Sequence, residues 1–207
     1  MIGQLHHQLK EATAPIHRRL DAHSILTPLT GLDLDIERYQ QIMVQHWWAY
    51  RCWQPQLDRA FPATRLGKPW QIDLALDKLS LDCADQLKTS VRLTAPEPAP
   101  LTVEGSAEYL GCAYVFEGSR LGGRYIYKAL QSRRAHLGVD RFHYYETLAQ
   151  NTSVAWPAWV QQLEAYAVAN DLAFEQIVSG AVACFEVLTD WFKQPQVAPS
   201  RTIQTVL

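Results

Sequence analysis

The sequence predicts an all-α fold in a single domain of about seven or eight helices. Long segments carry apolar residues at helical spacing, runs of alternating β-branched residues are almost absent, and proline and glycine are sparse where the helical spacing is clearest. A chain of 207 residues that is 48% hydrophobic and 19% charged can bury the core of such a domain. We expect residues 1–193 to form the domain and residues 194–207 to form a polar C-terminal tail.

The first helix is predicted from Gln4 to Ala22. Pro15 falls inside this segment, so the helix should kink or restart there, with Thr13 as a plausible cap. The apolar stripe of this helix consists of Leu5, Leu9, Ala12, Ile16 and Leu20.

The remaining helices follow from the same spacing. A second helix is expected from Asp35 to Phe61, past a kink at Pro55, with a dense set of aromatic side chains turned inward. The segment TAPEPAPLT, residues 94–102, is the clearest connector, because its prolines exclude a helix. Further helices are predicted over residues 72–92 in one or two pieces, 102–134, 141–150, 154–169 and 172–192.

Composition excludes several classes of protein. No run of apolar residues is long enough to span a bilayer, and the N-terminus lacks the apolar centre of a signal peptide, so we expect a cytoplasmic protein without membrane contact. With a net charge of −2, the chain lacks the overall positive charge that is typical of proteins that bind nucleic acid. The four cysteines lack zinc-site spacing, and we expect them to be reduced and buried.

The stretch VFEGSRLGGRYI, residues 115–126, places three glycines inside the helix predicted over 102–134. Each helical glycine costs about 0.5–1 kcal/mol relative to alanine, so the cluster needs a compensating reason. At about 100° per residue, Gly111, Gly118 and Gly122 fall on one stripe, while Gly123 lies farther round. A bare stripe suits either close packing of another helix or a planar ligand that a histidine holds from the other side.

Two sequence motifs favour a planar ligand over close packing of another helix. The segment LKEATAPIHRRLD, residues 9–21, resembles the proximal-helix motif of haem oxygenases, whose final histidine ligates haem iron. The segment YVFEGSRLGGRYI, residues 114–126, resembles the glycine-rich distal helix of the same family, especially its bacterial branch associated with bacteriophytochromes. The resemblance implies an all-α haem oxygenase-like bundle with haem between the first helix and a glycine-kinked distal helix.

The resemblance also implies roles for individual residues. His17 is the expected iron ligand, and Lys10 the expected partner of a haem propionate. The backbone at Gly118, Gly122 and Gly123 would then lie over the porphyrin face.

The distal water is expected to be held differently from the animal-type enzymes. Ser119 stands where those enzymes carry a distal aspartate, so the Ser119 hydroxyl and the Gly118 carbonyl are the candidate anchors, unless Ser119 only bonds back to its own helix. For Glu117 we expect a structural ion pair or a hydrogen bond at the helix bend.

The implied activity is oxidative cleavage of haem, both cofactor and substrate, to biliverdin, CO and ferrous iron. It uses O₂ and electrons from a donor such as a ferredoxin or a flavoprotein reductase, and a bacteriophytochrome is one conceivable recipient of biliverdin. Phytochrome chromophore supply and iron acquisition both stay open as its purpose. A positive rim for an acidic donor would consist of Arg18, Arg19, Lys128, Arg133 and Arg134.

Three alternatives stay open from the sequence. The same fold could bind or transfer haem without turnover. A thiaminase-like relative could instead use Cys112 or Cys184 as a nucleophile near Glu108 or Glu186. A haem-free helical interaction domain would make His17 and the glycine stripe coincidental.

Overall fold

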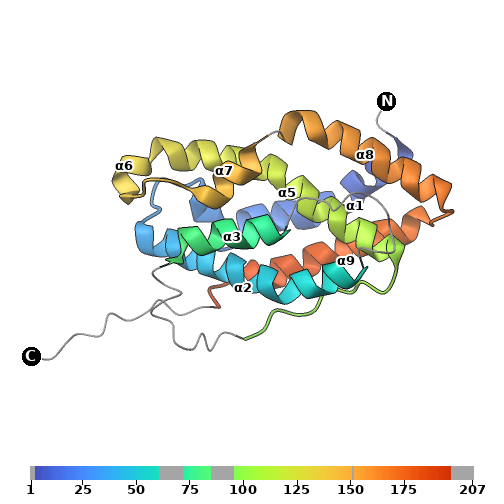
Figure 1. The fold of residues 1–207 in the computed structure, drawn as a ribbon, viewed down its shortest axis with the longest axis horizontal. Coiled ribbons are helices and arrows are strands. Elements are labelled where there is room, and N and C mark those ends of the chain that lie inside the picture. The colour runs from blue at the N-terminus through green and yellow to red at the C-terminus, as the bar shows by residue number, and fades with distance from the viewer. Residues whose placement is uncertain (1–2, 61–71, 85–95, 151, 197–207) are drawn as a thin grey trace, which may run out of the picture.

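The computed structural model describes residues 3–60, 72–84, 96–150 and 152–196, and within these ranges the chain is helical without strands. The all-α prediction is therefore confirmed. No helix in the described ranges has an apolar stretch that could cross a membrane. The elements, drawn in Figure 1, are α1 (Gln4–Ala22), the 3-10 helix η1 (Thr27–Leu29), α2 (Ile36–Ala60), α3 (Ile72–Asp82), α5 (Ser106–Ser132), α6 (Arg134–Leu137), α7 (His143–Ala149), α8 (Thr152–Ala169) and α9 (Phe174–Phe192).

Most predicted boundaries agree with these elements to within a few residues. The long helix predicted to start at Thr102 begins at Ser106 instead, because the connector continues to the N-cap Gly105. The predicted continuation of the third helix over residues 85–92, the predicted end of the second helix at Phe61 and the last residues of the tail, 197–207, lie outside the described residues.

Helix α1 is continuous through Pro15, so of the two expected outcomes, a kink or a restart, the restart is wrong. Thr13 is not a cap either, because it is buried in the middle of α1, where its hydroxyl donates a 2.7 Å hydrogen bond to the Leu9 carbonyl. That bond satisfies the hydroxyl inside the helix. The true N-cap is Gly3, and the Glu164 carboxylate of α8 accepts the Gln4 amide at 3.0 Å.

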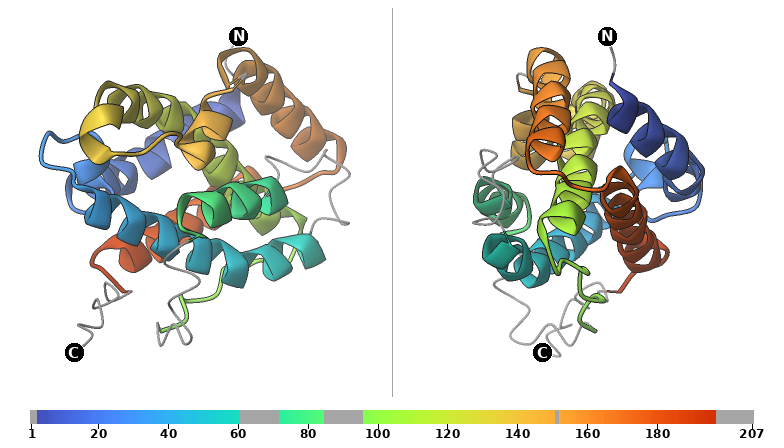
Figure 2. Two further views of the ribbon diagram at one scale, coloured as in Figure 1. Left: turned by 60° about the vertical axis from the view of Figure 1, so that its left-hand side comes forward. Right: turned by 90° about the vertical axis from the view of Figure 1, so that its right-hand side faces the viewer.

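Helix α9 is the common support of α1 and α5, and the right-hand view of Figure 2 shows it beside both. The contact with α5 is a close approach of two backbones. A Cβ at Gly111 would stand 2.4 Å from the Ala181 nitrogen, and a Cβ at Gly180 would stand 2.7 Å from the Glu108 Cα. Gly111 is therefore explained by helix packing.

The face of α2 turned toward the core is rich in aromatic side chains, as predicted, although Trp47 is only half-buried. Tyr50 and Tyr144 bring their hydroxyl oxygens within 3.1 Å of each other, which joins α2 to α7. His46 is enclosed among these rings, and burial lowers its pKa to about 4. The core thus keeps a neutral imidazole at neutral pH.

The start of the C-terminal tail is fixed to α2 by the buried Gln45. The Gln45 side-chain amide donates to the carbonyls of Trp191 and Gln194, at 2.8 Å and 3.1 Å, and its oxygen accepts the amide of Gln196 at 3.0 Å. The first tail residues therefore continue the packing of the domain. The division of the chain at residue 193 stays a prediction.

Candidate functional site

One face of α1 is directed toward α5 and α8. His6 precedes His17 by eleven residues, which is about 20° beyond three full turns, so the two imidazoles share this face. The ring of His6 contacts Tyr114 of α5 and Trp156 of α8 at centroid distances of 6.0 and 6.1 Å. Lys10, seven residues before His17, lies on the same face and is exposed.

His17 combines an exposed ring with a fixed orientation. Its side chain is 55% exposed, its Nδ1 lies 3.0 Å from the Asp21 carboxylate, and its ring meets Phe185 of α9 edge-on at 5.5 Å. When the neutral imidazole donates its Nδ1 proton to Asp21, Nε2 carries the lone pair that can bind a metal. His17 is therefore arranged as a metal ligand needs to be.

The glycines of α5 divide into two groups. No atom lies within 4 Å of the Cβ position at Gly122, and at Gly118 the nearest atom there is the Trp156 ring, at 3.4 Å. At Gly123, by contrast, a Cβ would meet the Leu148 side chain of α7 at 2.6 Å. The bare backbone surface thus lies at Gly118 and Gly122, while Gly123 serves the packing of α7, and its role toward haem remains a prediction about its backbone alone.

The polar residues beside these glycines are bound within the protein. Ser119 donates a 2.7 Å hydrogen bond to the Phe116 carbonyl, as in the alternative in which it bonds back to its own helix. Glu117 is buried and forms a 2.7 Å ion pair with Arg120, which confirms the structural role expected for it. Arg120 also donates to the Gln150 carbonyl at 3.0 Å, which ties this part of α5 to the end of α7.

Helix α5 contacts α1 at one end and the segment that follows α1 at the other. At one end, four rings, which we call the aromatic wall, meet between α1, α5 and α8: His6, Tyr114, Trp156 and Trp159. At the other end, the Arg133 guanidinium donates to the carbonyls of Leu29 and Gly31 in the loop after α1. His17 and Gly122 lie between these ends along their own helices, and both are exposed.

A family model described as "Heme oxygenase" matches residues 3–194. The chain belongs to the haem oxygenase family. It is also 30% identical to a protein named "Heme oxygenase" from Xanthomonas campestris pv. campestris (strain 8004), over 152 residues that cover 73% of this chain and 87% of that protein. Membership agrees with the all-α fold and supports haem degradation as the general activity.

Among the described residues of this haem oxygenase fold, none joins His17 to complete a metal site. In the described ranges no three His, Cys, Asp or Glu residues gather closely enough to hold an ion. A metal role for His17 therefore requires a metal whose other ligands arrive with it, as in a porphyrin.

The buried thiols do not resemble a nucleophilic site. Cys112 and Cys184 are almost fully enclosed between α5 and α9, and their thiols share a hydrogen bond. Burial raises the pKa of Cys184 well above its ordinary value, which opposes formation of a thiolate. Glu186, named with them in the thiaminase-like alternative, is exposed on α9.

The positive rim predicted as a docking surface for an electron donor loses one of its five residues. Arg133 is committed to the two loop carbonyls, so it joins helices instead of facing a partner. Arg134 lies 4.0 Å from Asp140, and Arg18, Arg19 and Lys128 are exposed.

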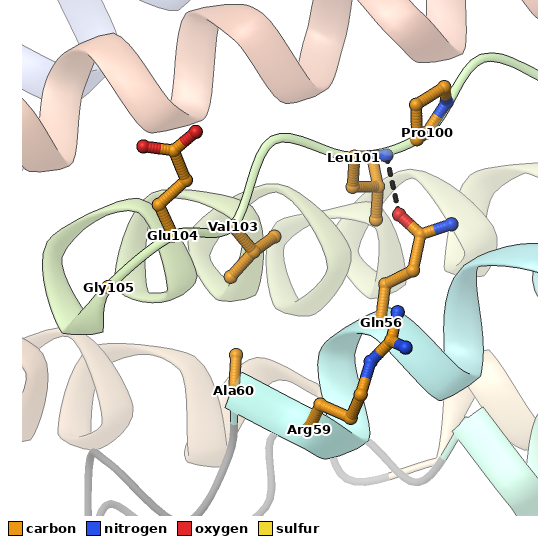
Figure 3. Close-up of a pocket in the computed structure, with 8 residues that line it drawn as sticks. All are labelled: Gln56, Arg59, Ala60, Pro100, Leu101, Val103, Glu104 and Gly105. Carbon is orange, nitrogen blue, oxygen red and sulfur yellow. Dashed lines mark hydrogen bonds between the residues drawn. The ribbon is translucent and has the colours of Figure 1, made fainter.

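A cavity of about 500 Å³ lies elsewhere, between the end of α2, the connector and the start of α5 (Figure 3). The Gln56 side chain lies at the edge of the cavity, where its oxygen accepts a 2.8 Å hydrogen bond from the Leu101 amide. Arg59 and Glu104 lie on opposite sides of the cavity. None of the residues predicted for the site lines it. This cavity is therefore separate from the site on α1 and α5.

The sequence did not single out Asp21, Phe185 or Trp156. Asp21 follows His17 by four residues, and this i, i+4 spacing was a usable signal for a side-chain contact on a helix. Phe185 and Trp156 approach the site only through the packing of α8 and α9, so no local pattern marks them.

Proposed function

We propose that this protein is a haem oxygenase that cleaves haem to biliverdin, CO and ferrous iron, using O₂ and electrons from an external donor. The observation that carries the proposal is the orientation of His17, whose Nδ1 is occupied by Asp21 and whose Nε2 is left for a metal, on the face of α1 directed toward α5.

The residues present fit a flat iron macrocycle. The open space at Gly122 would be filled by any Cβ, so the glycine preserves room for a ligand directly against the helix backbone. His17 would supply one imidazole to the iron, and the bare backbone at Gly122 offers no side chain that would compete as a ligand. Bound haem supplies the iron that binds oxygen and the ring carbon that is oxidised.

The residues around the proposed haem site would have separate roles. Asp21 keeps His17 in the tautomer that presents Nε2, and Phe185 limits rotation of the ring. On the α5 side, Ser119 uses its proton for the Phe116 carbonyl, so its oxygen can only accept a hydrogen bond from a distal water. The Gly118 carbonyl is the second candidate acceptor for that water.

The charged edge of haem needs a cation. Lys10 lies about 10 Å from His17 along the axis of α1, on the same face, and its long side chain reaches outward from there. It is our candidate for binding one propionate. The exposed Arg18, Arg19 and Lys128 are the candidate contacts for an acidic ferredoxin or a flavoprotein reductase. A cytoplasmic location and transfer of biliverdin to a bacteriophytochrome remain part of this proposal.

The test is haem titration followed by reaction with O₂ and a reductase system, with the product separated by chromatography. We expect the wild-type protein to bind haem with a histidine-ligated spectrum and to release biliverdin. His17→Ala should lose that spectrum.

His7→Ala is a matched control, because His7 is also exposed on α1 and also pairs with an acidic residue four positions later, Glu11 at 3.3 Å. It should bind and degrade haem as the wild type does. Haem binding without biliverdin would make the chain a haem-binding or haem-transfer protein, and absence of haem binding would leave a helical interaction domain.

A further inference from the structure

Tyr125 is a large aromatic side chain that α5 leaves in solvent. It is 75% exposed, and it forms no hydrogen bond or ring contact with any residue that the structure describes. It follows Gly122 by three residues, and the Cβ position of Gly122 has no atom within 4 Å. A single exposed tyrosine is ordinary on a protein surface, so its meaning depends on what lies across from it.

The position of Tyr125 follows from the contact between His6 and Tyr114, whose rings lie 6.0 Å apart. Helices α1 and α5 run in the same direction, both from right to left in Figure 1. His17 follows His6 by eleven residues, and Tyr125 follows Tyr114 by eleven residues. Eleven residues advance a helix by about 16 Å and turn it about 20° beyond three full turns, so each ring keeps the face of its predecessor.

A contact at the other end of α5 agrees with this alignment. Arg133, eight residues after Tyr125, donates to the carbonyls of Leu29 and Gly31 in the segment after α1. The first turns of α5 therefore lie beside the first turns of α1, and the last turns of α5 lie beside the segment that α1 leads into. His17 and Tyr125 occupy the same level between these two contacts.

Solvent reaches the rings at this level. The side chain of His17 is 55% exposed and Tyr125 is 75% exposed, whereas Tyr114 is buried. Side chains are thus enclosed where α1 and α5 first meet, and exposed eleven residues later on both helices. A planar ligand bound to Nε2 of His17 would meet α5 at Gly122 and Tyr125.

Lys10 determines which way haem would lie at this level. It precedes His17 by seven residues, which is about 10 Å toward the start of α1. A propionate bound by Lys10 turns the charged edge of haem to that side and the apolar edge away from it. Tyr125 lies about 4.5 Å beyond Gly122 in this second direction. A phenol ring suits the place, because it covers apolar surface while its hydroxyl keeps a water partner.

We infer that Tyr125 is a haem-binding residue: its ring covers the face of haem opposite His17, on the half turned away from Lys10, and fills the exposed space beside Gly122. The inference rests on the proposed function in one respect, since it requires haem to bind at His17. It does not require turnover. Tyr125 acts in it as a ring contact and not as an iron ligand.

Chemical modification tests the position of the ring without turnover. Tetranitromethane nitrates exposed tyrosines, and peptide mass spectrometry follows each tyrosine in the ligand-free protein and in the protein loaded with ferric haem. With haem at about ten times its Kd, only about a tenth of the protein is ligand-free, so nitration of Tyr125 should slow about tenfold. Tyr127 is the internal control, because it lies about 200° round α5 and its hydroxyl accepts from Gln131. Its nitration should not change.

Two variants separate the ring from the hydroxyl. Because Tyr125 is exposed and has no described partner, neither Tyr125→Ala nor Tyr125→Phe should shift the urea midpoint of the ligand-free protein. We expect haem to bind Tyr125→Ala about tenfold more weakly and Tyr125→Phe within about twofold of the wild type. Tyr127→Phe is the matched control and should bind haem as the wild type does.

The two proposals fail in different ways. Equal nitration of Tyr125 with and without haem, in a protein whose haem spectrum depends on His17, would overturn the role of Tyr125 and leave the haem site standing. A histidine-ligated spectrum that survives in His17→Ala would overturn the proposed site, and the inference with it. A charge-transfer band between iron and tyrosine that disappears in Tyr125→Phe would make Tyr125 an iron ligand, which also contradicts the inference.

Discussion

Replacing Gly122 with alanine should change the stability of the ligand-free protein and its affinity for haem in opposite directions. The Cβ position at Gly122 has no neighbouring atom, so the added methyl group meets no clash inside the protein. A glycine-to-alanine change within a helix then gains about 0.5–1 kcal/mol of stability. For a chain of this length we expect the melting temperature to rise by about 2–4 °C per kcal/mol gained.

The same methyl group would occupy the space that we assign to the macrocycle. We expect haem to bind at least about tenfold more weakly, which corresponds to about 1.4 kcal/mol, because either the ring must shift or the helix must move away. A change that stabilises the protein while it weakens ligand binding identifies a residue kept for function at a cost in stability.

The assay combines urea unfolding of the ligand-free protein with haem titration followed in the Soret band, for the wild type and Gly122→Ala. A variant with higher stability and wild-type haem affinity would refute the idea that this glycine makes room for haem. A loss of stability in the ligand-free protein would show that the space beside Gly122 is filled, and would remove the geometric basis of the site.

Three further predictions concern other residues. Gly111→Ala should destabilise the protein by about 1–3 kcal/mol in urea unfolding, since its Cβ would stand 2.4 Å from backbone atoms of α9. Asp21→Asn should weaken haem binding by up to about tenfold in titration, because it alters the hydrogen bond that orients His17. His46 is neutral in the fold with a pKa of about 4, below the ordinary 6.5 of the unfolded chain, so its contribution to stability is lost as the pH falls. Between pH 7 and pH 5 that loss is about 2 kcal/mol, and His46→Gln should show a correspondingly flatter dependence of unfolding free energy on pH.

The sequence was sufficient for most of the helices and for the two motifs on which the proposed site rests, because both depend on local information. Helical spacing marks α1 and α5 directly, and the motifs around His17 and Gly118 are contiguous. The i, i+4 relation between His17 and Asp21 is equally local.

The remaining features depend on which helices become neighbours. Gly111 and Gly122 fall on the same stripe of the predicted helix, yet one packs against α9 and the other faces open space. Gly123 turns toward Leu148 only because α7 folds back along α5. Thr13 was assigned to a cap because Pro15 follows it, whereas the packing of α1 on α9 keeps the helix unbroken. Contacts of this kind have no signature in residue spacing.

The contacts of His6 with Tyr114 and Trp156 join α1 to α5 at one end, and the contacts of Arg133 with the carbonyls of Leu29 and Gly31 join α5 to the segment after α1 at the other. A rigid disc cannot therefore pass lengthwise between the two helices unless one of these joints comes apart. If haem binds where we propose, it has to enter sideways, through the solvent-exposed flank beside His17 and Gly122. A ring-opened, pliable tetrapyrrole could depart along the same route while both joints stay intact.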